Sequence, residues 1–109
     1  MQVPLQITFR GMSPSPAVES LIRERSIRME RFNERIIHCH VVIDVPHRRS
    51  RKGKQFAVHL DITTPTGPII ISRDRAAGGA HQELDVAVRD AFDAATRRLE
   101  DEVRRHRAA

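Results

Sequence analysis

The side chains in this sequence that could do chemistry are mostly cationic, and their arrangement indicates anion binding. The segment from His47 to Lys54 has no apolar residue and carries five positive side chains at neutral pH, on Arg48, Arg49, Arg51, Lys52 and Lys54. Alternating apolar residues on both sides of it predict a long β-hairpin with this basic segment at its tip. Because crowded like charges repel one another, the tip either stays solvated or binds a polyanion.

A second set of arginines lies on a predicted helix over residues 16–33 and just beyond its end. At about 100° per residue, one flank of its apolar stripe carries Arg25, Arg28, Arg31 and Arg35. The acidic residues Glu19, Glu30 and Glu34 lie on the other flank. Solvated helices usually mix the two signs to gain pairs between successive turns, so this sorting indicates a docking surface. The alternative is an ordinary solvated face.

A third set lies on a helix predicted from His81 almost to the end of the chain. Arg98 and Arg105 are seven residues apart along one edge of its apolar stripe, and Arg97 and Arg104 repeat the spacing nearer solvent. Acidic residues 100–102 interrupt this basic surface. The arginines of the last turn also complement the helix dipole, which gives them a structural reason to be there.

The composition fits one small basic domain spanning residues 1–109. The formal net charge is +5, and arginine supplies most of the positive charge, which favours nucleic acid over an anionic membrane as partner. A single cysteine excludes an internal disulfide and fits a reducing compartment. The sequence shows neither a signal peptide nor an apolar run long enough to span a bilayer, so a cytoplasmic location is expected.

Enzymatic chemistry is not indicated by the sequence. It contains no glycine-rich phosphate loop, nucleophile elbow or paired-acid motif, and Gly78-Gly79 is more typical of a hinge than of a phosphate cradle. Cys39 is expected to point inward and His38 and His40 outward, which separates the possible metal ligands. A weak site shared by His38, His40 and His59 is the alternative. We therefore predict no catalytic residue, metal, cofactor or small-molecule substrate.

The order of elements predicts an α+β fold, β-α-β-β-β-α. We expect strands over residues 3–10, 37–45, 56–62 and, in a short form, 69–73, with a flexible connection over 74–80. The first two strands should be parallel and the others antiparallel, in a four-stranded mixed sheet with both helices on one face, like a double-stranded-RNA-binding domain. The inward residues of the second and third strands are expected to be Ile37, Cys39, Val41, Ile43, Val45, Phe56, Val58, Leu60 and Ile62. Arginines at the edges of the two helices should then form a continuous basic groove.

Several stretches form a joint pattern: residues 7–12, Met29-Glu30-Arg31-Phe32 with Arg35-Ile36-Ile37, Pro46-His47-Arg48 with Arg51-Lys52-Gly53 and Phe56, and His81, Glu83 and Leu84 with residues 91–95 and Arg97-Arg98-Leu99. Together they resemble the ribosome hibernation-promoting factors, also called ribosome-associated translation inhibitors or sigma-54 modulation proteins. The likeness covers nearly the whole chain. Asp85 stands where a large residue is common in the family, and acidic residues 100–102 interrupt what is often a richer basic run.

The resemblance implies binding of the small ribosomal subunit through ribosomal RNA, in the channel of messenger and transfer RNA, with inhibition of translation in stress. It places Arg25, Arg28, Arg35, Arg97 and Arg98 on basic positions of the family. It further implies a short form, which we expect to be a monomer off the ribosome. Two alternatives remain at this point: a protein-interaction module that modulates a transcription factor, and a general binder of double-stranded RNA.

Overall fold

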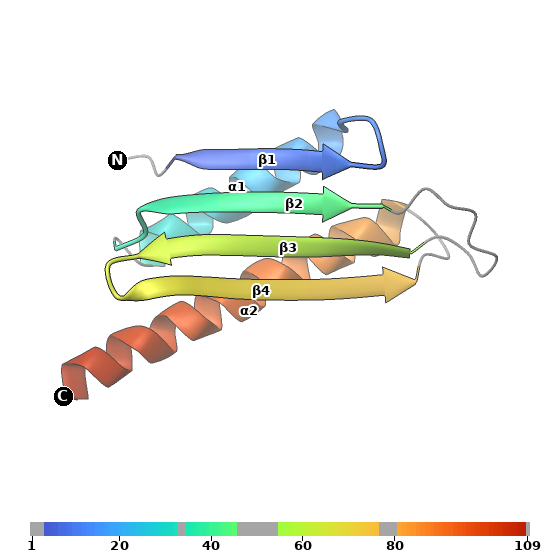
Figure 1. The fold of residues 1–109 in the computed structure, drawn as a ribbon. Coiled ribbons are helices and arrows are strands. Elements are labelled where there is room, and N and C mark those ends of the chain that lie inside the picture. The colour runs from blue at the N-terminus through green and yellow to red at the C-terminus, as the bar shows by residue number, and fades with distance from the viewer. Residues whose placement is uncertain (1–3, 33–34, 46–54, 77–80, 109) are drawn as a thin grey trace.

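The computed structural model describes residues 4–32, 35–45, 55–76 and 81–108, which form a four-stranded sheet covered on one face by two helices (Figure 1). The elements are β1 (Leu5–Arg10), α1 (Pro16–Phe32), β2 (His38–Asp44), β3 (Gln55–Thr64), β4 (Gly67–Ala76) and α2 (His81–Ala108). The strand order is β1-β2-β3-β4, with β1 parallel to β2 and the other two pairs antiparallel. The predicted α+β fold is confirmed.

The N-terminus of α1 is capped as its sequence predicts. The Ser15 hydroxyl accepts a hydrogen bond from the Val18 backbone N–H at 3.3 Å, and Pro16 occupies the first helical position. A serine oxygen satisfies one of the free N–H groups of the first turn, and proline has no N–H to satisfy there. This cap fixes where α1 begins and therefore the turn at which each arginine of the helix lies.

The exit from β1 depends on Gly11. Its φ is +78°, and a Cβ built on it would lie 1.7 Å from the Val45 carbonyl oxygen. A side chain is excluded both by that contact and by the left-handed backbone. The close approach brings the end of β2 to the end of β1, where the Val45 N–H donates to the Arg10 carbonyl at 2.9 Å.

The sheet has one apolar and one polar face because its strands alternate. The residues that point toward the helices on β2 and β3 are fully buried: Cys39, Val41, Ile43, Val58, Leu60 and Ile62. They pack with the apolar stripes of α1 and α2, which include Ile22, Met29, Val88 and Phe92. We call this side the covered face and the opposite side, which carries His40 and His59, the open face.

Two boundaries differ from the sequence prediction. β4 is longer than residues 69–73, because positions 74–76 continue the ladder opposite positions 55–57 of β3 instead of forming a connection. A charged edge strand is tolerated, since one of its sides faces solvent. Ile37 was expected in the core but is 52% exposed, whereas Ile36 is buried. Both precede β2, so the alternation of the strand does not yet hold at these positions.

α2 crosses behind the sheet, and its C-terminal turns extend past β4 (Figure 1). Leu99 is buried, but Val103 is only half-buried and Arg104 and Arg105 are exposed. The last turns therefore lie beyond the sheet that buries the rest of the stripe. No helix among the described residues is long and apolar enough to cross a membrane.

Candidate nucleic-acid interface

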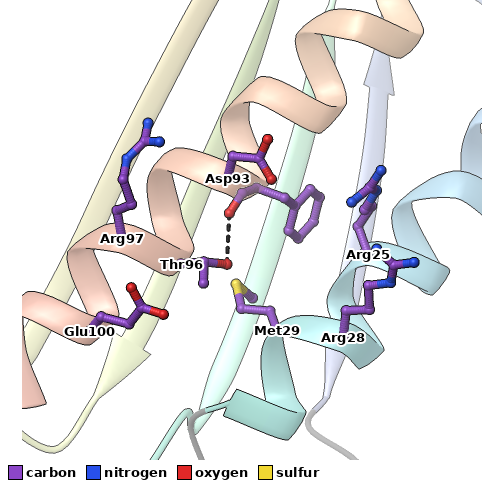
Figure 2. A pocket seen from close by; sticks show the side chains of 8 residues that line it. Arg25, Arg28, Met29, Asp93, Thr96, Arg97 and Glu100 are labelled. Atoms are coloured by element: carbon purple, nitrogen blue, oxygen red, sulfur yellow. Dashed lines mark hydrogen bonds between the residues drawn. The ribbon is translucent and has the colours of Figure 1, made fainter.

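A groove of about 310 Å³ lies between the two helices, on the side of the helix layer away from the sheet core (Figure 2). It is lined by Arg25, Arg28 and Met29 of α1 and by Phe92, Asp93, Thr96, Arg97 and Glu100 of α2. The floor is apolar because Met29 and Phe92 are buried core residues. The two walls are polar and differ in charge.

The α1 wall is purely cationic. Arg25 and Arg28 are three residues apart, so they lie on the same side of the helix, one turn from each other. Arg28 is exposed and Arg25 is half-buried. Among the described residues, neither guanidinium forms an ion pair with a carboxylate, whereas Arg23 on the outer side of α1 lies 3.7 Å from Glu19.

The guanidinium of Arg25 is incompletely satisfied. Its Nε is buried and forms no hydrogen bond within the described part of the chain. Leaving a buried donor unpaired costs roughly 1–3 kcal/mol. An anion at the accessible end of the guanidinium would form charge-assisted hydrogen bonds there, which are stronger than bonds between neutral groups.

The α2 wall carries mixed charge. On a helical wheel of α2, drawn at about 100° per residue, the groove residues follow Thr96 in the order Glu100, Asp93 and Arg97 with increasing angle. The two carboxylates therefore stand nearer to α1 than Arg97 does, and Figure 2 shows Arg97 projecting from the far side of α2. The Thr96 hydroxyl is occupied, since it donates to the Phe92 carbonyl at 2.9 Å. The expected continuous basic groove is thus wrong for α2, because acidic residues alternate with basic ones along its flank.

The predicted arginines are divided between the groove and other surfaces. The structure brings together Arg25, Arg28 and Arg97. Arg31, Arg35 and Arg98 are exposed outside the groove lining, and Arg105 is exposed with its guanidinium 3.5 Å from the Glu102 carboxylate. Arg98 follows Arg97 by a single residue, so it points away from the groove. Arg48, Arg49, Arg51, Lys52 and Lys54 lie outside the described residues, as does Gly78-Gly79.

The open-face histidines are engaged with neighbouring hydroxyls. His40 Nε2 is 2.9 Å from the Thr8 hydroxyl, and His59 Nδ1 is 2.8 Å from the Ser72 hydroxyl.

Cys39 lies on the covered face, as predicted. Burial, with a smaller contribution from the charge of Asp61, raises the pKa of its thiol from 9.0 to about 12, which makes the thiol a poor nucleophile. No group of three metal-binding side chains occurs within the ranges that the structure describes.

Reasoning from the sequence missed the roles of Asp93 and Thr96 in the groove. It treated residues 100–102 only as an interruption of a basic surface, although Glu100 is part of a groove wall. A helical projection of α2 places all three on one flank. It does not say that this flank adjoins α1, which is decided by the packing of both helices on the sheet.

Comparison with known proteins identifies the class to which this helix-on-sheet protein belongs. The family model described as sigma 54 modulation protein / S30EA ribosomal protein matches residues 5–107. The chain belongs to this family, which is a family of ribosome-associated factors and is not known as one of enzymes.

Two solved structures share the fold. A ribosomal subunit interface protein from Coxiella burnetii superposes with a TM-score of 0.73 at 15% identity, covering 92% of this chain and 97% of the other. The N-terminal domain of Protein Y from Thermus thermophilus superposes with a TM-score of 0.70 at 16% identity, covering 93% of this chain and 98% of the other. These likenesses show that the chain shares its fold with both proteins despite low sequence identity.

Proposed function

We propose that this chain binds the small ribosomal subunit by laying its helix layer against ribosomal RNA, and that it inhibits translation by occupying the channel of messenger and transfer RNA. Family membership supports the ribosome as the partner. The observation that carries the site is the α1 wall, where Arg25 and Arg28 face an open groove without a carboxylate partner among the described residues. Arginine forks of this kind match phosphate oxygens.

The mechanism is occupancy. Contacts to phosphates supply affinity and fix the orientation of the protein, whereas they carry little sequence information. The shape of the subunit then selects the site. With 4% aromatic residues and neither tryptophan nor tyrosine, the chain has few side chains on which bases could stack. In this role the protein acts in the cytoplasm during stress or stationary phase, as a single ribosome-binding domain that is a monomer off the ribosome.

The remaining predicted residues extend this surface. Arg31, Arg35, Arg98 and Arg105 would contact neighbouring phosphates beyond the groove, and the basic segment from Arg48 to Lys54 would add a second contact region. Each neutralised phosphate contributes about 0.9 to the slope of log affinity against log salt on duplex DNA and about 0.7 on single strands. The slope for the subunit therefore reports how many of these cations take part.

The test is cosedimentation with purified small subunits over a salt series, together with inhibition of cell-free translation. The double variant Arg25→Glu/Arg28→Glu should lose subunit binding by about 100-fold or more, because two charge-assisted contacts become repulsions. Arg23→Glu/Arg104→Glu is the matched control, since each of its arginines already faces a carboxylate of its own helix. Its loss should be under about tenfold.

Three results would redirect the proposal. Equal losses in the two double variants would remove the groove from the binding surface. Equal affinity for naked duplex RNA and for the subunit would favour a general double-stranded RNA binder. A stable protein partner without ribosomes would favour the modulation of a transcription factor.

A further inference from the structure

The acidic residues of the α2 wall require an explanation, because their negative charge repels the phosphates of any RNA in the groove between the helices. Asp93 and Glu100 are exposed and line the same groove as Arg25 and Arg28. Neither carboxylate forms a hydrogen bond or ion pair with a groove arginine within the described ranges. They are therefore not simply neutralised by the cations that they face.

Two further acidic residues of α2, Asp101 and Glu102, behave differently. Asp101 and Glu102 each lie within ion-pair distance of an arginine three residues further on, Arg104 and Arg105. Pairs of this kind are common on solvated helices and stabilise them slightly. Asp93 and Glu100 lack that local role, and their position in the groove gives them an effect on whatever enters it.

From this arrangement we infer that Asp93 and Glu100 are specificity-determining residues, which repel phosphates from the α2 wall and so restrict binding to RNA that presents its phosphates to the α1 wall alone. This deepens the proposed function and rests on it. Specificity can be obtained by placing like charges against the wrong partner as well as by contacts to the right one. Here the wrong partner is any duplex that lies across both walls.

The physical argument depends on how differently the two ligands can approach. A naked RNA duplex presents phosphates in every register, so many of its encounters bring a phosphate against Asp93 or Glu100. A folded ribosomal site holds the protein by its shape, so one register dominates and its phosphates can bypass the carboxylates. Neutralising the carboxylates should therefore help the duplex more than it helps the subunit.

The test measures both ligands with three proteins. The wild type, Asp93→Asn/Glu100→Gln and the control Asp44→Asn/Asp61→Asn are titrated with a labelled RNA duplex of unrelated sequence and with purified small subunits, at the same salt concentration. The control raises the net charge by the same amount, but on the open face, opposite the helices. A circular dichroism melt of each protein verifies that it is folded.

We expect Asp93→Asn/Glu100→Gln to bind the duplex about tenfold more tightly and the subunit less than about threefold more tightly. The control should change both affinities by less than about threefold. Equal gains for the two ligands, or a gain no larger than that of the control, would overturn the inference. The wild-type titration tests the proposed function separately, because a wild type that does not bind subunits refutes that function whatever the variants do.

Discussion

The two faces of the sheet differ although the same strands supply both. On the covered face, alternate residues of β2 and β3 are fully buried and apolar, and the helices above them carry the arginines of the groove. On the open face, the formally charged residues of β1, β2 and β3 are Arg10, Asp44 and Asp61. Among the described residues of these strands and of the two helices, positive charge is therefore concentrated on the helix layer, which is the side suited to a polyanion.

The difference indicates that the two faces have separate roles. Burial of the covered face under the helices stabilises the fold, whereas the histidine–hydroxyl hydrogen bonds of the open face lie outside the core. Neighbouring positions on one strand can then be compared directly, since they share a backbone and differ only in the face to which they belong.

The largest expected difference is in stability. Leu60→Ala should lower the free energy of unfolding by about 2–5 kcal/mol, because it leaves a cavity in the core. The adjacent His59→Ala should cost less than about 1 kcal/mol, since His59 lies on the open face. Urea denaturation of both variants measures this. Similar losses would mean that the open face is covered in solution.

The second difference appears at alkaline pH. Because the folded pKa of Cys39 is raised from 9.0 to about 12, its contribution to stability is intact below pH 9 and is lost as the pH rises toward 12. Each pH unit in that window removes about 1.4 kcal/mol. Urea melts at pH 8 and pH 10.5 should therefore show a larger fall for the wild type than for Cys39→Ala.

His40→Ala, on the open face beside Cys39, serves as the control for this pH effect. It should retain the alkaline loss of the wild type, because it leaves the buried thiol in place. If Cys39→Ala lost as much stability as the wild type between the two pH values, the thiol would not be the group that titrates.

A third difference concerns binding. Arg28→Gln and Arg10→Gln each remove one positive charge, from the helix layer and from the open face. The first should weaken subunit binding by about tenfold, whereas the second should change it by less than about twofold. Cosedimentation at moderate salt measures both. Should Arg10→Gln prove the more damaging, the open face would be the one that meets the ribosome.

The smallest effect is expected at the open-face hydrogen bonds. Ser72→Ala removes the partner of His59 Nδ1, and because this pair is exposed, the loss in stability should be below about 1 kcal/mol. Thermal melts at pH 7 would show it as a small fall in Tm. A fall as large as that of Leu60→Ala would indicate that the pair is a structural link between β3 and β4.

Much of the fold was predictable because local patterns and the fold agree. The period-two runs of β2 and β3 placed Val41, Val58 and Leu60 correctly on the buried side, and Ser15 before Pro16 located the start of α1. The patterns failed where pairing extends a strand. Residues 74–76 are polar or small and resemble a connection, but the ladder with β3 recruits them into β4.

The candidate site was predictable only in part. The position of Arg25 and Arg28 on one flank of α1 follows from helical periodicity alone. That Arg97 shares a groove with them, together with Asp93 and Glu100, does not, because it depends on which flank of α2 meets α1.

By itself, the sequence determined the order of elements, the apolar face of each and the excess of arginine, since these depend on residue type and on fixed periods of about 2.0 and 3.6 residues. Only the tertiary structure decided which charges face one another. Two helices must pack side by side on one sheet before a charge on one can neighbour a charge on the other. Which charges meet depends on the rotation of each helix about its own axis, and the packing of the core sets that rotation.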